Sequence, residues 1–484
     1  MASPRTSPSF AEDESGFGTL WNIFWCICFL LIGGLVIDHA NAMRIKMALQ
    51  ATADSAALGA IMVRSEPSKY ESYFGTAPGG LSAEQRGQAA AISLSTNIMG
   101  TETNGSVLDG ADVKFGTWTK EGGFVTGAGD FAQVTTYRAD RNDNALQMLL
   151  LDAFTPLKSW DVAAQAVAQR YRPDCAKDGV ITSDVVDLQS NSKFKNGICV
   201  HGGKGVELNR NDVFDPGVIV QMPDLALLKV PGGDTSKNTG LDAALREGTL
   251  APGLAMQTDE IITGLQDISS EWQPDYVSGN PAAQLIDVTE SAFDPANLVE
   301  GNVYRVTCNG GNGTLNLRGK ASQNALGPTD ITFAKKDNGG GKGGGGDESG
   351  GPSIIEEVVI VTNCQVTFSQ ETVIQNAIVA TSDTSAKSVS GSASVSIGRP
   401  DNCAPGGGAQ IVTAGGMHFA AKMEFHGSQL VSKGPVKLAA QVDGIGGTSI
   451  QSLSRVDFAS NNEMGLCEGE ADEVLPLNYY RLVD

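Results

Sequence analysis

The most constraining feature of this sequence is an uncharged apolar run near the N-terminus, residues 19–37. As an α-helix rising about 1.5 Å per residue, it would extend roughly 28 Å, close to the hydrocarbon thickness of a bilayer. An acidic cluster at residues 12–14 precedes it, and residues 38–44 continue the helical pattern without a proline. The run therefore predicts a transmembrane helix that projects the rest of the chain to one side of a membrane.

A cleaved secretory signal peptide is the alternative, because Ala40-Asn41-Ala42 is an acceptable cleavage site. Such a peptide has a basic start and a short apolar core. Here Arg5 is the one basic residue before the run, and Trp21 and Phe29 are among its bulky side chains. These features favour a retained anchor.

The orientation of the anchor follows from two opposing signals. Arg44, Lys46 and Arg64 follow the run, which weakly favours a cytoplasmic downstream side. A long downstream region can translocate regardless of charge, and its cysteines suit an oxidising compartment. We therefore expect a single-pass protein of the bacterial inner membrane, with residues 1–16 as a cytoplasmic tail and the bulk of the chain in the periplasm.

Six cysteines lie downstream of the apolar run, an even number that predicts three disulfides. Cys26 and Cys28 lie inside the run and act as small apolar residues. Fifteen pairings are possible for six cysteines, and the one with the shortest loops joins neighbours along the chain. Neither CxxC nor Cys/His spacing is present, so we expect no zinc site. The six are Cys175, Cys199, Cys308, Cys364, Cys403 and Cys467.

The composition excludes nucleic acid as a partner and points to several domains. The chain has 484 residues, a formal charge of −21 and a pI near 4.6, without long basic runs. Glycine is abundant at 59 residues and aromatic residues make up 6%. This balance suits short strands and turns rather than a large aromatic-rich enzyme core.

The membrane-proximal third is predicted to be helical and then α+β. Helix 17–64 combines the anchor with an Ala-rich face, which could pack on similar stalks or on the protein's own next domain. That domain, residues 65–172, is expected to hold a helix capped by Ser82, strands 112–118 and 131–138, a helix at 142–154 and a strand at 160–169.

The distal part repeats itself every 19 or 20 residues. Residues 410–412 resemble 429–431 and 449–451, and residues 417–420 resemble 436–439 and 456–459, with an earlier copy expected at 377–379 and 395–397. Short strands at a fixed period predict a β-solenoid, or parallel β-helix-like region, over residues 353–470. An antiparallel sandwich with chance similarity is the alternative. Residues 173–335 are expected to be β-rich with a helical insertion near 231–300, and Gly-rich residues 336–352 to form a linker.

The N-terminal region resembles the TadE/TadG-like proteins of the tight-adherence (Tad) machinery, which assembles Flp pili. About fifty residues carry the resemblance, and polar positions agree as well as apolar ones. We find no Gly-x4-Glu prepilin-peptidase site before the run, so the resemblance is to the TadG-like branch. The Asp-x-Ser-x-Ser motif of a von Willebrand A domain is also missing. The matching residues are Glu14-Ser15-Gly16, Thr19-Leu20, Gly33-Gly34-Leu35-Val36-Ile37-Asp38, Asn41-Ala42, Arg44, Leu49-Gln50 and Ala53-Asp54-Ser55-Ala56-Ala57-Leu58.

This resemblance implies a role in pilus assembly through protein contacts, with other pilus-assembly or pseudopilin-like proteins as partners and a homo-oligomer as an option. It also marks a set of anchor residues. They are Gly16, Gly34, Asp38, Arg44, Gln50 and Asp54.

Catalytic chemistry has little support. The four histidines are scattered, although His418 and His426 fall on neighbouring predicted strands, and no hydrolase elbow, zincin, Rossmann or kinase motif is present. Asp401, Lys422 and Lys433 are isolated candidates for a solenoid enzyme. We expect no enzyme activity, cofactor or metal. A carbohydrate-binding solenoid that shares only the anchor is the first alternative function, and a polysaccharide-degrading solenoid is the second.

Overall fold

The chain is described by a computed structural model that divides into two compact units. Unit 1 comprises Met1–Tyr171 and Asn478–Asp484, and unit 2 comprises Arg172–Leu477. The structure describes residues 15–66, 81–171, 179–195, 197–309, 313–318, 320–321, 353–401, 403–404, 406–439, 445–466 and 478–483. The predicted Gly-rich linker, Cys175 and Cys467 lie outside these ranges.

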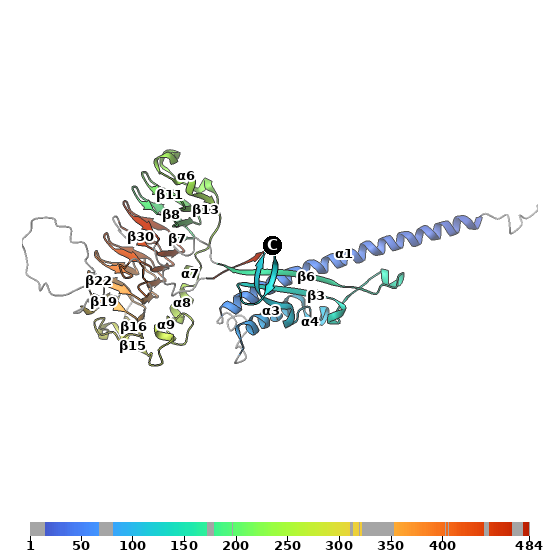
Figure 1. Ribbon diagram of the computed structural model, residues 1–484, viewed down its shortest axis with the longest axis horizontal. Helices are drawn as coiled ribbons and strands as arrows, with labels where there is room; N and C mark the ends of the chain where they lie inside the picture. The colour runs from blue at the N-terminus through green and yellow to red at the C-terminus, as the bar shows by residue number, and fades with distance from the viewer. Residues whose placement is uncertain are drawn as a thin grey trace, which may run out of the picture. The chain divides into compact units, whose positions relative to one another are not determined.

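Unit 1 is built on one long helix, α1 (Ser15–Ser65), that no proline interrupts. Its portion Gly18–Ser65 is, among the described residues, the one helix long and apolar enough to cross a membrane. The first part of α1 carries many exposed apolar side chains, whereas alanines spaced three and four residues apart further along are buried. The predicted apolar anchor and its continuation are thus one helix (Figure 1).

An antiparallel sheet completes unit 1, with five strands among its described residues, in the order β2-β1-β3-β6-β35. Helices α1 and α3 (Ala83–Met99) pack on it, and Ser82 caps α3 through the predicted reciprocal capping box. Apolar residues of both helices and the sheet share one core. The strands are β1 (Val113–Thr119), β2 (Gly123–Thr126), β3 (Phe131–Arg138), β6 (Val162–Tyr171) and β35 (Tyr479–Val483), with short elements α4 (Thr101–Asn104) and η1 (Gly110–Asp112) beside them.

Gly87 of α3 permits the close approach of α3 to α1 and the sheet. A Cβ added there would lie 2.7 Å from the Ala60 carbonyl oxygen and 2.7 Å from the Phe115 ring. We predict that Gly87→Val destabilises unit 1 by roughly 1–3 kcal/mol, because overpacking pushes the helices apart. Thermal unfolding of the purified chain in detergent measures this loss of stability. Gly100→Val is the control that separates backbone strain from crowding, because Gly100 has a φ of +67° and an added Cβ would have no atom within 4 Å. An equal loss in both variants would contradict the packing explanation.

The predicted helix over residues 142–154 is wrong. The segment instead holds η2 (Asp140–Asn142), β4 (Leu146–Gln147) and η3 (Leu151–Ala153), and β4 pairs with β5 (Ser159–Trp160). Asn144 explains the difference, because its amide donates to the carbonyls of Ser106 and Tyr137 and accepts from Ala139. These bonds fix Asn144 against β3 and the chain before β1, so the segment starts in a non-helical conformation.

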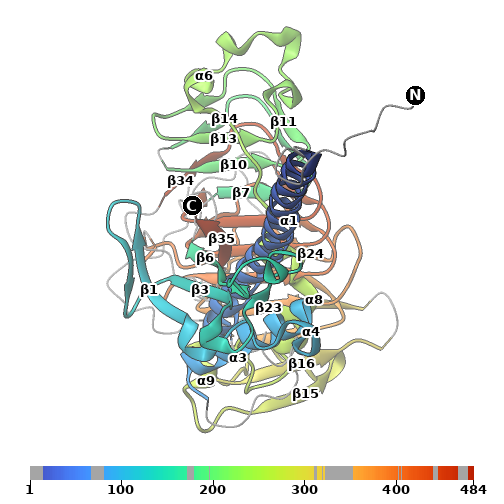
Figure 2. The ribbon, with the colours of Figure 1, turned by 90° about the vertical axis from the view of Figure 1, so that its right-hand side faces the viewer.

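Unit 2 consists mainly of three sheets of parallel strands. The first has eleven strands among the described residues, in the order β14-β13-β10-β7-β32-β29-β26-β23-β20-β16-β15. Figure 2 shows β14, β13, β10 and β7 following one another in this stack. In sheet order, the bounds are β14 (Leu245–Glu247), β13 (Ile219–Met222), β10 (Cys199–Gly202), β7 (Gly179–Thr182), β32 (Ser449–Ser452), β29 (Gln429–Ser432), β26 (Ala409–Thr413), β23 (Ala377–Thr381), β20 (Val359–Thr362), β16 (Val303–Thr307) and β15 (Leu285–Thr289).

In the part of the chain that the structure describes, the second sheet has eight strands and the third nine, and the strands of each follow the same order along the chain as those of the first sheet. The second is β11 (Gly205–Leu208), β8 (Val185–Leu188), β33 (Val456–Phe458), β30 (Val436–Leu438), β27 (Met417–Phe419), β24 (Val389–Gly391), β21 (Gln365–Phe368) and β17 (Thr314–Leu317). The third is β12 (Val213–Phe214), β9 (Lys193–Phe194), β34 (Glu463–Gly465), β31 (Ile445–Gly446), β28 (Glu424–His426), β25 (Ser396–Ile397), β22 (Thr372–Gln375), β19 (Ser353–Glu356) and β18 (Lys320–Ala321), of which the last pair is antiparallel.

The predicted repeat register is confirmed for the C-terminal strands. Gln410 pairs with Gln429, which pairs with Ser449, and Met417 pairs with Val436, which pairs with Val456. The pairing is parallel, so the antiparallel sandwich is wrong. The earlier copy is half right: residues 377–379 do pair with β26, but residues 395–397 enter the third sheet, and β24 takes the expected place in the second.

The strand order does not follow the chain order. The first strand of unit 2, β7, lies between β10 and β32, which is the last strand of that sheet along the chain. Gly179 pairs with Cys199 on one side and with Ser449 on the other. The beginning and end of unit 2 are therefore neighbours in the middle of the stack.

The expected helical insertion is present as short helices that follow β13. Leu254 of α7 donates its N–H to the Gln451 side chain of β32 at 3.0 Å, and α8 contacts β26. These contacts bury Gln410 and Gln451 on the outer face of the eleven-stranded sheet. The helices are α6 (Leu241–Ala244), α7 (Gly253–Met256), α8 (Thr258–Gly264) and α9 (Asp275–Ser278), with η4 (Leu225–Leu227), η5 (Pro231–Gly233), η6 (Thr235–Lys237) and η7 (Glu290–Ala292).

One disulfide is described in full, Cys308–Cys364, which belongs to the shortest-loop arrangement. Cys199 and Cys403 are also disulfide-bonded, and their partners lie outside the described residues. Cys26 and Cys28 are free.

Candidate functional site

The candidate anchor residues lie along α1, and several of them attach the helix to the rest of unit 1. Asp38 makes the most contacts: its carboxylate accepts hydrogen bonds from the backbone N–H groups of Leu149, Leu150 and Leu151, at 2.7 to 3.3 Å. The carboxylate is 2% exposed. Charge-assisted bonds of this kind are about twice as strong as neutral ones, so Asp38 fixes this loop to the helix.

Gln50 and its neighbours form a second attachment between α1 and the rest of unit 1, twelve residues after Asp38. Its amide donates to the Asp54 carboxylate at 2.8 Å and to the Gln165 carbonyl of β6 at 3.0 Å. Thr136 of β3 donates to the Leu49 carbonyl at 3.0 Å. Gln50 and Asp54 therefore act together, with Asp54 orienting the amide that reaches the sheet.

The remaining anchor residues have other roles. Gly34 faces the loop that Asp38 holds, since an added Cβ would lie 3.3 Å from the Leu150 Cβ. Arg44 is exposed and donates to Asn41 at 3.1 Å, and Gly16 lies in the first turn of α1. The Ala-rich face is fully buried against α3 and the sheet. Packing of that face on other stalks is therefore wrong, and the alternative, packing on its own domain, is correct.

Unit 2 presents a different kind of site, a row of polar side chains on the outer face of the eight-stranded sheet. Each strand contributes one such residue, and parallel pairing places it beside the corresponding residue of the adjacent strand. The residues before and after it in the sequence point into the core. In sheet order they are Glu207, Asp187, Asp457, Lys437, His418, Ser390, Thr367 and Asn316. We call this the polar row.

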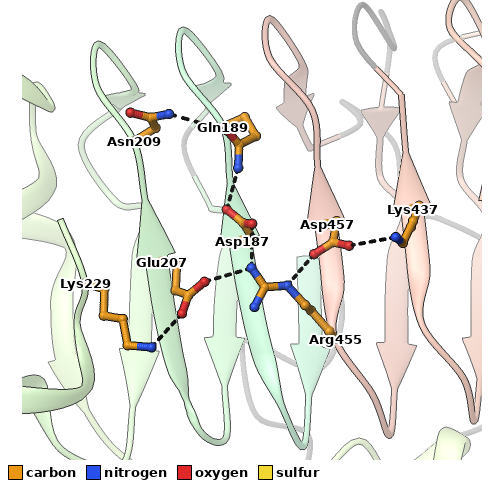
Figure 3. A network of polar contacts seen from close by, with 8 residues as sticks. All are labelled: Asp187, Gln189, Glu207, Asn209, Lys229, Lys437, Arg455 and Asp457. Carbon is orange, nitrogen blue, oxygen red and sulfur yellow. Dashed lines mark hydrogen bonds and ion pairs between the residues drawn. The ribbon is translucent and has the colours of Figure 1, made fainter. Parts of the chain in front are cut away.

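An arginine–carboxylate cluster occupies one end of the polar row (Figure 3). Arg455 contacts Asp187 at 2.5 Å, Glu207 at 2.7 Å and Asp457 at 2.6 Å. Burial would lower the pKa of Arg455, but its bonds to the carboxylates raise it, so the guanidinium stays charged. Lys229 and Arg455 together hold the pKa of Glu207 below its usual range.

The cluster borders a hollow of about 490 Å³ whose lining includes Asp187, Lys437, His418 and Arg455. Burial and the nearby Lys387 and Lys437 lower the pKa of His418, so its ring is neutral at pH 7 and offers both a donor and an acceptor. The hollow thus combines carboxylates, cations and a neutral imidazole. Such a surface can bind a polar or mixed-charge ligand.

We predict that Arg455→Gln destabilises unit 2 by about 1 kcal/mol, because three neighbouring carboxylates lose their shared cation. The loss should shrink at 1 M salt, where repulsion between exposed charges is screened. Urea denaturation of the full-length protein at low and high salt checks this. Lys229→Gln, which removes one partner of Glu207 alone, serves as the control, and a larger loss in it than in Arg455→Gln would contradict the prediction.

Comparison with known families gives two matches. Residues 16–63 match the family model described as putative Flp pilus-assembly TadE/G-like. Residues 179–336 and 339–468, more than half of the chain, match a domain of unknown function, DUF7867. The chain belongs to the DUF7867 family and begins with a TadE/G-like segment. No curated protein and no solved structure matches it.

The two matches coincide with structural divisions. The TadE/G-like segment is α1 and includes all six anchor residues, which confirms the resemblance read from the sequence. The DUF7867 match begins at Gly179, the first residue of β7, and ends within unit 2. Four strands of the unit 1 sheet, β1, β2, β3 and β6, lie between these matches, and the fifth, β35, follows the second match.

The other residues singled out in the sequence do not converge on one site. His418 and His426 are on strands of different sheets, and His426 lies 3.6 Å from Glu424. Lys433 pairs with Asp259 at 2.7 Å, whereas Asp401 pairs with Arg399. Among the described residues, no three or more His, Cys, Asp or Glu side chains are arranged so that they could hold a metal ion.

The sequence reading of the DUF7867 region missed the Arg455 cluster. Arg455 and Asp187 are separated by 268 residues and meet because β33 pairs with β8. The signal that could have found them is the alternation in Val456-Asp457-Phe458 and Val186-Asp187-Leu188, which share an inward–outward–inward pattern.

Proposed function

We propose that this protein is a membrane-anchored periplasmic component of Flp/Tad-type pilus assembly, acting through protein contacts rather than catalysis. The observation that carries the proposal is the TadE/G-like match at residues 16–63. The contacts of Asp38 and Gln50 add physical support, because matched polar residues attach the helix to a folded domain. An anchor of this design ties the folded domain directly to the membrane-spanning helix.

The proposed topology is a single pass through the bacterial inner membrane with the N-terminus in the cytoplasm. Two observations support it. The first part of α1 exposes its apolar side chains on all sides, as a lipid-facing helix does. Unit 2 carries disulfide-bonded cysteines, which persist in the periplasm and are rare in the cytoplasm.

For unit 2 we propose a β-solenoid. The strands of all three sheets follow the same order along the chain, and the inward-facing apolar residues of the three sheets form one continuous core. Each repeat would advance the stack by about 4.8 Å, the spacing of paired strands. Such a stack is rigid and presents long polar rows, which suits contact with an extended partner or with further copies of the chain.

Deletion of the gene with plasmid complementation tests the proposal. Pili are counted by electron microscopy, and attachment to a surface is scored in parallel. We expect both to be lost on deletion, restored by the intact gene, and not restored by a gene lacking residues 19–37. Normal pili and normal attachment in the deletion strain would contradict the proposal.

Glycan binding is the second candidate function, and the polar row with its hollow favours it. The described lining of this hollow includes one aromatic residue, Phe458, which is buried and offers no stacking surface. Binding would therefore depend on hydrogen bonds and charge. Normal pili with weakened attachment in the deletion strain, together with saturable binding of a polysaccharide to the purified protein, would favour this candidate. Glycan cleavage would instead indicate the solenoid enzyme.

A further inference from the structure

A loop of unit 1 exposes large apolar side chains to an unusual degree for a folded domain. It lies between β4 and β5, and we call residues 149–157 the apolar loop. The exposed fractions are 61% for Leu149, 40% for Leu150, 48% for Phe154 and 54% for Leu157. Four large apolar side chains within nine residues form a patch that a soluble surface does not favour.

The apolar loop lies beside the apolar run of α1 (Figure 1). Asp38, the first charged residue after that run, accepts hydrogen bonds from Leu149, Leu150 and Leu151. Leu150 and Leu151 also face Gly34, at 3.3 and 3.6 Å from the position of a Cβ. Gly34 lies four residues before Asp38, about 6 Å along the helix axis into the apolar run.

The polar residues around the loop suit a position at the edge of a membrane. Lys158 pairs with Asp152, so these two charges of the loop region cancel. Trp160 lines a hollow of about 310 Å³ together with His39, Met43 and Lys46. Tryptophan and lysine are residues that anchor proteins at the level of the lipid headgroups.

We propose that the apolar loop inserts into the periplasmic leaflet of the bilayer beside α1, so that unit 1 sits on the lipid surface. The inference rests on the proposed function in one respect, the topology: residues 19–37 span the membrane with the rest of unit 1 on the periplasmic side. A lipid surface is the occupant that fits, because the patch continues the lipid-facing surface of α1 and reaches the interfacial depth of about 5–10 Å at which apolar side chains insert.

Site-directed fluorescence in nanodiscs tests this. Cys26→Ala and Cys28→Ala remove the free thiols of the described chain, and an environment-sensitive NBD label is placed on Phe154→Cys or, separately, on Leu149→Cys. Val125→Cys, 60% exposed on β2 of the same unit, is the matched surface control. Ile27→Cys, within the apolar run, reports on the anchor. Each full-length variant is embedded singly in nanodiscs of phosphatidylcholine with or without brominated acyl chains.

We expect brominated lipid to quench the labels at residues 154 and 149 at least threefold more strongly than the label at residue 125. Aqueous iodide should show the opposite order. The inference would be overturned if iodide quenched the labels at residues 154 and 149 as strongly as the label at residue 125. If brominated lipid still quenched the label at residue 27, the transmembrane anchor would stand. Protection of 154 and 149 from both quenchers would also overturn the inference, because protein would then cover the loop. Iodide access at residue 27 would overturn the transmembrane anchor itself.

Discussion

Replacing Asp38 by alanine should detach the loop at residues 149–151 from α1 and destabilise unit 1 by about 4 kcal/mol. Three backbone N–H groups lose a buried carboxylate acceptor at once. Hydrogen bonds to charged groups contribute about 1.5–3 kcal/mol each, and donors left unsatisfied add their desolvation cost. Part of this loss is recovered because the freed N–H groups can meet water. Hydrogen exchange of the full-length protein in detergent, read over residues 149–151, should accelerate several hundredfold.

Two further variants separate the bond network from the charge. Asp38→Asn keeps an acceptor oxygen without the charge, so we expect an intermediate acceleration. Arg44→Ala removes an exposed residue of the same helix, whose side chain donates to Asn41, and should leave exchange at residues 149–151 unchanged. If Asp38→Ala left the exchange of these amides unaltered, the assigned role of Asp38 would be wrong.

Replacing Asp212 by asparagine should stabilise unit 2 by roughly 2–4 kcal/mol at pH 8. The magnitude follows because each unit by which folding raises the pKa of a carboxyl costs about 1.4 kcal/mol of stability once the carboxyl is ionised. Asp212 belongs to a buried column of turn residues, one from each neighbouring repeat: Asn462, Ser192, Asp212 and Asn238. Its Oδ1 accepts from the Ser192 N–H at 2.8 Å, whereas its buried Oδ2 has no hydrogen-bond partner among the described residues. Burial raises the pKa of Asp212 to about 7, although the Ser192 bond lowers it.

Asparagine fits this column because its amide can donate where the carboxylate cannot. Asn462 and Ser192 each donate to the carbonyl three residues earlier, those of Ala459 and Gln189. The equivalent acceptor for residue 212 is the Asn209 carbonyl, which receives one bond from Asn238 and has a second lone pair. The variant therefore replaces an unpaired buried oxygen with a donor.

The pH dependence has a definite sign. The folded-state pKa of about 7 exceeds the ordinary value of 3.8, so the folded chain holds this proton more tightly than the unfolded chain. The contribution of Asp212 to stability is therefore greatest below about pH 4, falls between pH 4 and 7, and stays low above pH 7. Urea denaturation at pH 5 and pH 8 should show a larger gain for Asp212→Asn at pH 8. The exposed Asp242→Asn is the control, and equal or lower stability of Asp212→Asn at pH 8 would contradict the prediction.

The helix and the C-terminal register were predictable from the sequence because both depend on local pattern. Nineteen uncharged residues can be little else than a buried or membrane helix, and a 19- to 20-residue period with the same offset in two motifs requires stacked strands. The TadE/G-like segment was recognisable because polar positions such as Asp38 and Gln50 agree with the family pattern. In the structure these two residues hold the helix to the loop and to β6.

The remaining features depend on contacts between distant segments. Residues 142–154 have a helical pattern, but Asp38 of α1 accepts from the N–H groups of residues 149–151, and the Asn144 side chain bonds to the backbone of Ser106 and Tyr137. The Arg455 cluster needs β33 beside β8, a pairing that the chain order does not suggest. His418 and His426 lie on consecutive strands that belong to different sheets, an arrangement that likewise does not follow from the local pattern.

The position of β7 between β10 and β32 has a consequence for the order of events during synthesis. The first repeats of unit 2 have one open sheet edge until the last ones are in place, since β7 pairs with Ser449–Ser452, some 270 residues further along the chain. An open edge offers unpaired backbone groups to any other chain, and distant pairing is slow to form. The incomplete chain therefore exposes this edge to pairing with other chains until the last repeat closes it.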